Sequence, residues 1–180
     1  MGKRSSFERL PRDSYATPAE AVAPLLPHLR PGLTYAEPCC GDGALIGHLD
    51  SAGHICRFAA DIDPRMEGAH TVNALTVARG SMGYAEAVIT NPPWDRKILH
   101  PLISHLSAML PCWLLFDAEW ANTKQSIPFL PWCHKIVSIG RVRWIPGTTM
   151  TSKDSCCWYL FDQTTPRLTT GPVFFGRTPQ

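Results

Sequence analysis

The chain has 180 residues, 44% of them hydrophobic, and a formal net charge of +2. That length and apolar content fit one domain with a buried core, and no apolar run approaches the roughly 20 residues of a membrane-spanning helix. The seven cysteines lack the Cys-x-x-Cys spacing of a zinc site, and the charge is too small to indicate a nucleic-acid partner by itself.

The chain begins Met-Gly-Lys-Arg-Ser-Ser, which is basic but is not followed by the apolar segment of a secretory signal. An odd number of cysteines without paired spacing is typical of reduced, buried thiols rather than of a disulfide framework. We therefore expect a cytoplasmic protein with no membrane segment and no bound metal.

The first predicted helix begins near Thr17. Residues 17–20 read Thr-Pro-Ala-Glu, a capping box with proline at the first helical position. Pro24 and Pro27 are expected to shorten this helix, because proline lacks the backbone donor that a helix interior needs. The first dozen residues of the chain are expected to form a loose end.

A strand, a glycine turn and a helix are predicted next. Residues 33–36 form an apolar strand, 37–43 read Glu-Pro-Cys-Cys-Gly-Asp-Gly, and 44–49 are helical in pattern. Glycines in such a turn let the backbone approach a ligand closely at a helix start. Gly41 and Gly43 alone are a weak signal, since the full dinucleotide fingerprint is G-x-G-x-x-G.

A second apolar run, 55–60, ends at Asp61, roughly 20 residues beyond the glycines, a distance at which an acidic side chain commonly binds ribose hydroxyls. An aspartate at a strand end also serves as a helix cap or lies in a solvated turn. The glycine turn that precedes Asp61 favours the ribose-binding role.

The most informative segment is Val-Ile-Thr-Asn-Pro-Pro-Trp, in which a strand predicted over 86–91 ends. The side-chain oxygen of Asn91 and the backbone carbonyl of Pro92 offer two acceptors for the two hydrogens of a planar amine such as adenine N6. That arrangement frees the nitrogen lone pair for attack. Pro93 restricts Pro92 to an extended backbone, and neither proline adds a donor that would repel the amine.

Trp94 completes this segment with a flat indole on which a base can stack, a contact worth about 1–3 kcal/mol per base in nucleic-acid sites. Asn-Pro-Pro is also a common way to end a strand in a turn, so the tetrapeptide alone supports a binding site and a plain turn equally. The preceding glycine turn and acidic strand end favour the binding site.

The second half of the chain continues the alternation of strands and helices, which indicates an α/β fold with a mostly parallel sheet and right-handed crossovers. The tail after about residue 163 is expected to be a second loose end. The predicted elements are a helix over about 95–109, strands over 111–117, 135–143 and 155–162, and a hairpin loop around 145–154.

Together these motifs resemble those of class I S-adenosylmethionine-dependent methyltransferases that methylate amino groups of nucleic acids. Residues 37–43 are similar to the first motif of that family, 61–64 to the second and 91–94 to the catalytic fourth. Residues 13–18, Asp-Ser-Tyr-Ala-Thr-Pro, resemble the segment before the first motif in many DNA adenine methyltransferases. The resemblance covers about residues 13–162, and the motif order is similar to that of small phage and prophage adenine methyltransferases.

The resemblance implies a Rossmann-like methyltransferase fold, with a seven-stranded mostly parallel sheet, a C-terminal antiparallel hairpin and helices on both faces. It implies one methyltransferase domain over residues 1–180, without the separate target-recognition domain that DNA-modifying members usually carry. Sequence selectivity would then be low, rest on loops, or come from a partner subunit or a second copy of the chain.

The implied cofactor is S-adenosyl-L-methionine. Asp61 would bind its ribose hydroxyls and Ile62 would lie against its adenine ring. Asn73 stands where the family usually has an acid near the adenine amine, which is a departure, and an ordinary loop asparagine is the alternative. The residues implied to hold the methionine part, or to close over it, are Tyr15, Thr17, Glu37, Pro38, Cys40, Gly41, Gly43 and Asn91.

The implied reaction is direct displacement on the cofactor methyl group by adenine N6, held by residues 91–94. Ligands of an open parallel sheet lie at the carboxyl ends of its strands, so residues that follow other strands there are expected on the same rim. A duplex substrate would need its target base flipped out. The expected substrate residues form a basic and aromatic set, with a solvated hairpin and a core tryptophan as the alternative: Trp120, Arg141, Arg143, Trp144 and Lys153.

Several substrates stay open beside DNA adenine. RNA adenine would use the same pocket, and protein glutamine presents the same pair of amide hydrogens, although glutamine enzymes normally carry tyrosine at position 94 and an extra N-terminal helical domain. Cytosine N4 is a minor variant, since serine is more usual than Asn91 for that base. A different class of protein, a non-catalytic cofactor-binding subunit of a two-chain methyltransferase, also fits the cofactor motifs.

Overall fold

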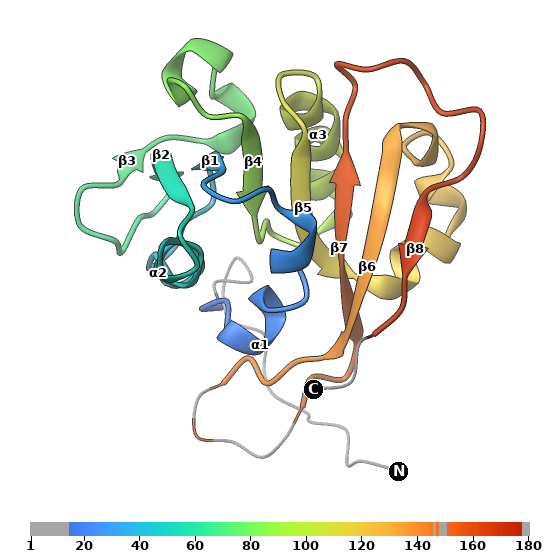
Figure 1. Cartoon of the computed structure of the whole chain (residues 1–180), viewed down its shortest axis with the longest axis horizontal. Helices are drawn as coiled ribbons and strands as arrows, with labels where there is room; N and C mark the ends of the chain where they lie inside the picture. The colour runs from blue at the N-terminus through green and yellow to red at the C-terminus, as the bar shows by residue number, and fades with distance from the viewer. Residues whose placement is uncertain (1–14, 146, 148–150, 178–180) are drawn as a thin grey trace.

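An eight-stranded sheet forms the centre of the computed structural model, which describes residues 15–145, 147 and 151–177 (Figure 1). The strands lie in the order β3-β2-β1-β4-β5-β7-β6-β8. They are β1 (Thr34–Glu37), β2 (Ile55–Asp61), β3 (His70–Thr71), β4 (Ala87–Thr90), β5 (Cys112–Asp117), β6 (Cys133–Arg141), β7 (Ser155–Phe161) and β8 (Val173–Phe175). The helices are α1 (Ala19–Val22), α2 (Ala44–Ser51) and α3 (Arg96–Ser107), with 3-10 turns at Leu26–His28, Ala74–Thr76, Arg79–Met82, Ala118–Asn122, Lys124–Ser126 and Leu130–Trp132.

The sheet is mostly parallel, as predicted. Strand β1 pairs in parallel with β2 and β4, and β4 pairs in parallel with β5. Strand β7 runs antiparallel to both β5 and β6, which confirms the C-terminal hairpin. Because β7 reverses between them, β5 and β6 point the same way, and their carboxyl ends lie at one edge of the sheet.

Both faces of the sheet are covered, and the alternation of side chains along the central strand divides the core in two. On β5, Leu114 and Phe116 point toward the face that α3 covers, whereas Leu115 points toward the face of α1 and α2. Helix α3 buries an apolar stripe at helical spacing, and α2 does the same on the other face. The buried stripes are Leu99, Leu102, Ile103 and Leu106 on α3, and Leu45, Ile46 and Leu49 on α2.

Two edge strands differ from the sequence prediction of seven strands and a loose C-terminal tail. Strand β3 has two residues and pairs with the end of β2, and β8 pairs in parallel with β6 through Lys135 opposite Val173. Segments of two and three residues are too short to show the period-2 alternation by which strands are recognised. Within the described residues, no helix is both long and apolar enough to cross a membrane.

Helix α1 is one turn long, and the capping box predicted at its start does not form. Proline at position 18 is the N-cap and no side chain caps the helix. The Thr17 hydroxyl instead accepts a hydrogen bond from Asn91, and the Glu20 carboxylate binds Arg143. Tertiary partners therefore replace the local ones. The loose end predicted for the first dozen residues lies outside the described residues.

Candidate active site

The carboxyl ends of β1, β2 and β4 surround one cavity of about 660 Å³. Because these parallel strands are neighbours, the residues that end or follow them meet at the same edge of the sheet. The three sequence motifs therefore form one site. Of the residues predicted to bind the cofactor or the target amine, those lining the cavity are Tyr15, Thr17, Glu37, Pro38, Cys40, Gly41, Asp61, Ile62, Asn73, Asn91 and Pro93. Of the family-like segment at 13–18, Asp13 and Ser14 lie outside the described residues.

The glycine turn has a backbone that other residues rarely adopt. Gly41 and Gly43 have φ angles of 52° and 80°, and Gly43 begins α2 as its N-cap. A Cβ atom at Gly43 would lie 2.7 Å from the Met66 sulfur, so this position also lacks room for a side chain. Gly43 is not among the residues that line the cavity, and its role in the structure is to shape the turn.

Asp61 ties this turn to the end of β2. Its Oδ2 accepts a hydrogen bond from the Gly41 backbone N–H at 2.9 Å, and its Oδ1 accepts one from the Asp63 N–H at 2.9 Å. A carboxylate has about four lone-pair sites, so each oxygen can still accept a hydrogen bond from a ligand in the cavity.

Glu37 is a buried acid at the end of β1. It is 1% exposed, and its Oε2 has no hydrogen-bond partner among the described residues. Burial, together with the nearby Asp61 and Asp42 carboxylates, raises the pKa of Glu37 well above its usual value. A carboxyl group that faces a cavity in this state is suited to receive a cationic ligand group, because a buried charge is stable only when it is paired.

Asn91 is held at both ends of its side-chain amide. Its Nδ2 donates a hydrogen bond to the Thr17 hydroxyl at 3.2 Å. Its Oδ1 accepts one from the Trp94 indole N–H at 3.3 Å, and the same N–H also donates to the Leu115 carbonyl of β5 at 3.1 Å. Pro92 is buried and is not among the residues that line the cavity.

Aromatic side chains gather beside the Asn-Pro-Pro-Trp segment. The rings of Trp94 and Trp144 are 5.9 Å apart and nearly perpendicular, and Tyr15 lies 6.3 Å from Trp144. Trp144 follows β6, so it reaches this site from the edge of the sheet at which the sequence predicted it. It is half-buried rather than part of the fully buried core.

The predicted basic residues lie on the same edge but differ in their surroundings. Arg141 ends β6 and Lys153 precedes β7, and both are exposed. Arg143 is exposed but is paired with Glu20, whose carboxylate lies 3.0 Å from the guanidinium. In the loop that joins these strands, Pro146 and residues 148–150 lie outside the described residues.

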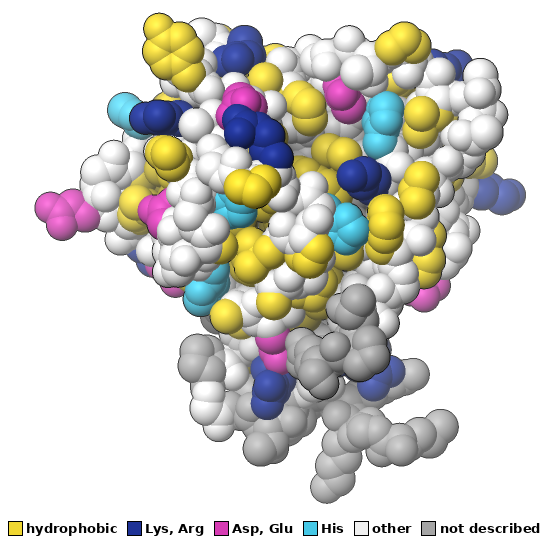
Figure 2. Space-filling model, in the orientation of Figure 1, with side chains coloured by type: hydrophobic (Ala, Val, Ile, Leu, Met, Phe, Trp, Pro, Cys, Tyr) yellow, Lys and Arg dark blue, Asp and Glu magenta, His cyan; other side chains and the backbone are white. Residues whose placement is uncertain are grey.

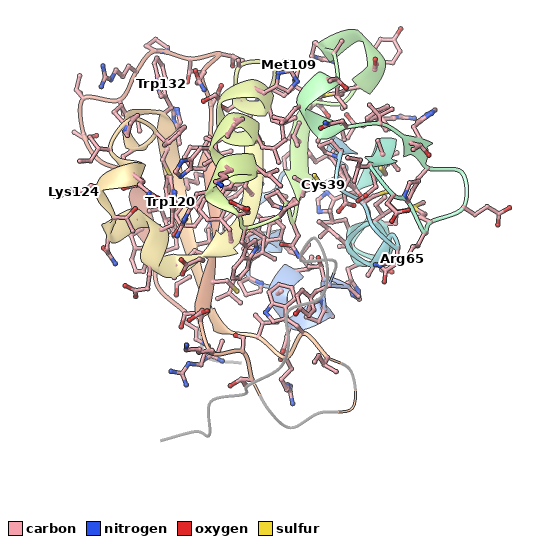
Figure 3. The ribbon with its side chains drawn as sticks, turned by 180° about the vertical axis from the view of Figure 1, so that it is seen from behind. Cys39, Arg65, Met109, Trp120, Lys124 and Trp132 are labelled. Carbon is pink, nitrogen blue, oxygen red and sulfur yellow. The ribbon has the colours of Figure 1, made fainter. Side chains whose placement is uncertain are left out.

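Trp120 does not belong to the site, and the prediction that it contacts substrate is wrong. It is fully buried, its indole N–H lies 3.0 Å from His100 Nε2 on α3, and its ring packs against Phe116 and Tyr159 (Figure 3). The carboxylate of Asp117 caps the 3-10 turn after β5, and this turn directs the tryptophan back into the core.

Arg65 is a cavity residue that the sequence analysis missed. Its backbone N–H donates to the Gly41 carbonyl at 2.9 Å, its guanidinium lies 4.0 Å from the Asp42 carboxylate, and it stands beside α2 (Figure 3). Its position four residues after Asp61 is the one signal that could have found it. Cys39 also lines the cavity, but burial raises the pKa of its thiol, which disfavours the thiolate. Among the described residues, no group of three His, Cys, Asp or Glu is arranged to hold a metal ion.

Comparisons with known proteins bear on the fold. No protein-family model and no curated protein sequence matches the chain. A proposed RNA methyltransferase from Pyrococcus horikoshii aligns with a TM-score of 0.57 and 16% identity, over 89% of this chain and 92% of its own. The M protein of the type I restriction enzyme EcoKI aligns with a TM-score of 0.56 and 10% identity, over 91% of this chain and 48% of its own.

A third solved structure, a proposed class I S-adenosylmethionine-dependent methyltransferase from Listeria monocytogenes, aligns with a TM-score of 0.50 and 10% identity. That alignment covers 87% of this chain and 63% of the Listeria protein. The chain thus spans nearly all of the Pyrococcus protein but about half of the EcoKI subunit. At these identities the likeness shows the architecture, and the chain has the Rossmann-like α/β fold of methyltransferases.

Proposed function

We propose that this protein is an S-adenosyl-L-methionine-dependent methyltransferase that methylates the N6 amine of adenine in DNA. The observation that carries the proposal is the meeting of three motifs in one cavity. The Asn91 amide, the Asp61 end of β2 and the Glu37 carboxyl all line it, and Glu37 Oε2 has no hydrogen-bond partner within the described part of the chain. The fold, which is that of methyltransferases, agrees with this reading.

The residues of the cavity fit the cofactor. S-adenosyl-L-methionine supplies an electrophilic methyl group. Glu37 would pair with its ammonium group, and the free lone pairs of Asp61 would accept hydrogen bonds from its ribose hydroxyls. Ile62 is 57% exposed at the cavity wall and would lie against its adenine ring.

In the family that the motifs resemble, an acidic side chain usually lies near the adenine amine of the cofactor. Asn73 would take its place in this chain. Its Oδ1 caps the turn Ala74–Thr76 by accepting from the Leu75 N–H at 3.0 Å. A second lone pair on that oxygen remains for the amine of the cofactor.

Replacing Glu37 by glutamine should weaken cofactor binding by about 10- to 100-fold, because a neutral amide loses the charge-assisted hydrogen bond to the ammonium group. Because the pKa of Glu37 is raised, its carboxyl holds a proton more readily than an exposed glutamate does, and pairing with an ammonium group requires the ionised form. Cofactor affinity of the unmodified protein should therefore rise with pH as the raised pKa is approached, and the variant should show no such rise. Isothermal titration calorimetry across a pH series measures both effects.

The raised pKa of Glu37 also links protein stability to pH, which gives a control that needs no cofactor. The folded pKa of Glu37 exceeds the unfolded one, so the folded protein binds more protons, and the free energy of unfolding should fall as pH rises between the two values. Glu37→Gln should remove that dependence. A cofactor affinity that is independent of pH and unaltered in the variant would contradict the assignment of this carboxyl.

Replacing Asp61 by alanine should weaken cofactor binding first, by about 10- to 100-fold, and leave kcat at saturating cofactor much less affected. The carboxylate serves the ribose and also holds the Gly41 N–H, so its loss loosens the glycine turn. Asp61→Asn is the matched variant, since one amide oxygen can retain only part of these bonds. Unchanged cofactor affinity in both variants would exclude the role.

In the chemical step, Asn91 Oδ1 and the Pro92 carbonyl would accept the two hydrogens of the target amine. This contact would draw the nitrogen lone pair out of conjugation with the ring and make it a nucleophile. The nitrogen would form its bond to the methyl carbon as the carbon–sulfur bond breaks, the sulfur would leave as a neutral thioether, and the surplus amine proton would pass to solvent. Among the described residues, no exposed cysteine lies in the cavity with a lowered pKa, and the proposed displacement needs no covalent enzyme intermediate.

Nucleic acid as substrate is supported by residues at the same edge of the sheet as the cavity. Trp144 beside Trp94 offers a surface for an unstacked base, and the exposed Arg141 and Lys153 suit phosphates. Basic side chains are otherwise scattered over the face seen in Figure 2 rather than gathered into one strip. Much of the affinity for nucleic acid would then come from a short local contact, from a partner subunit or from a second copy of the chain.

RNA adenine is the second candidate substrate. The Pyrococcus relative is described as an RNA methyltransferase, and the chain covers nearly all of it. The catalytic pocket meets only the base, so it serves both nucleic acids.

The test is a substrate panel with methyl-labelled S-adenosyl-L-methionine. Duplex DNA, single-stranded DNA, RNA and a protein extract are incubated separately with the chain and with Asn91→Ala. Label in DNA that the variant fails to transfer supports the proposal. Label in RNA or protein moves the function to that substrate. Cofactor binding without any transfer would favour the non-catalytic subunit of a two-chain enzyme.

A further inference from the structure

The side-chain amide of Asn91 must face its substrate with the oxygen and not with the nitrogen, because only the oxygen accepts the hydrogens of an amine. The two ends of an amide have nearly the same shape, so packing alone does not choose between them. Some chemically selective contact has to fix the orientation.

We propose that Trp94 and Thr17 are positioning residues that fix this orientation, with the Trp94 indole N–H as the selector. This inference rests on the proposed function and deepens it. An indole N–H donates and never accepts. The Asn91 atom 3.3 Å from it is therefore the carbonyl oxygen, since the opposite orientation would set two donors against each other.

Trp94 is suited to this task because its N–H cannot move away. It also donates to the Leu115 carbonyl at 3.1 Å, which anchors it to the backbone of the central strand β5. The indole is half-buried, contacts both core clusters and meets Trp144 edge to face at 5.9 Å. The donor is thus fixed by the fold before any substrate arrives.

Thr17 completes the arrangement at the other end of the amide. Its hydroxyl is buried at 4% exposure and accepts from Asn91 Nδ2 at 3.2 Å. A hydroxyl can donate or accept, so Thr17 stabilises the orientation that Trp94 selects. The amide oxygen keeps its second lone pair for the target amine.

The first test separates the donor from the ring. Trp94→Phe keeps an aromatic ring and removes the N–H, and it should lower kcat by about 3- to 10-fold while the cofactor Kd is retained. Thr17→Val should lower kcat in the same direction, and Thr17→Ser, which keeps the hydroxyl, should restore it. Full activity in both Trp94→Phe and Thr17→Val would overturn the inference.

A double-mutant cycle with Asn91→Asp distinguishes orientation from packing or stacking. The two oxygens of a carboxylate are equivalent, so the carboxylate introduced by this substitution needs no selector, and Thr17 can reverse its hydroxyl to donate. In this background Trp94→Phe should change kcat by no more than about twofold, the limit of additivity. An equal loss in both backgrounds would show that Trp94 acts through its ring alone.

If Asn91→Asp is inactive, the double-mutant cycle cannot be measured, and an NMR experiment that needs no activity takes its place. The side-chain amide signals of Asn91 can be assigned in a 15N NMR spectrum by their absence in Asn91→Ala. Trp94→Phe and Thr17→Val should shift these signals and speed their exchange with water, and Thr17→Ser should not. Signals unaltered by Trp94→Phe would refute the inference. If the unmodified protein methylates no substrate while these shifts occur, the proposed function fails and the positioning contact stands.

Discussion

Replacing Asn91 by alanine should lower kcat for methyl transfer by roughly 100- to 1,000-fold, the loss found when a donor or acceptor aimed at a developing transition state is removed. The amide oxygen is the side-chain acceptor proposed for the target amine, and no neighbour replaces it, because Thr17 and Trp94 contact the amide itself. Cofactor Kd should stay within about twofold, since Glu37 and Asp61 are the residues proposed to carry most of that binding. Single-turnover kinetics with saturating cofactor, beside calorimetric titration, measure both quantities.

Asn122 provides the matched control for this prediction. It is an exposed asparagine at the end of the turn Ala118–Asn122 and does not line the cavity. Asn122→Ala should leave kcat and cofactor binding unaltered. Full activity in Asn91→Ala, or loss of its cofactor binding with the fold intact, would contradict the catalytic assignment.

Replacing Trp120 by alanine should lower the free energy of unfolding by about 3–5 kcal/mol, the usual range for deleting a large buried aromatic side chain. The indole is fully buried, packs on Phe116, Tyr159 and Phe161, and lies within hydrogen-bond distance of His100. Its removal leaves a cavity between α3 and the sheet. Urea unfolding followed by circular dichroism measures the loss.

Trp144→Ala is the comparison variant, because Trp144 is half-buried beside Trp94. It should lose much less stability than Trp120→Ala and should weaken nucleic-acid binding, by about 1–3 kcal/mol if a base stacks there. Trp120→Ala should therefore act mainly on the free energy of unfolding, and Trp144→Ala mainly on nucleic-acid binding. A stable Trp120→Ala protein with weakened substrate binding would show that the core assignment of Trp120 is wrong.

The arrangement of the cavity could be predicted from the sequence because it follows from a general rule of parallel sheets. Once Glu37, Asp61 and Asn91 are each placed at a strand end, the fold brings them to one edge, and all three line the same cavity. The long apolar strands and α3 could also be predicted, because their periodic patterns extend over four residues or more.

The features that the sequence did not reveal depend on contacts between distant residues. Trp120 and Trp144 both follow a strand at the same edge, and only the short turn after β5 sends one into the core and leaves the other at the rim. The predicted capping box does not form, and Glu20 instead binds Arg143, which is 123 residues away in the sequence. The Asn91 amide likewise donates a hydrogen bond to Thr17, 74 residues before it.

The most direct test of the account is the identity of the methylated product. DNA that has been incubated with the protein and methyl-labelled S-adenosyl-L-methionine is digested to nucleosides and analysed by mass spectrometry. The account predicts labelled N6-methyladenine with the unmodified chain and none with Asn91→Ala. A labelled N4-methylcytosine or C5-methylcytosine, or label that persists when Asn91 is removed, would contradict it.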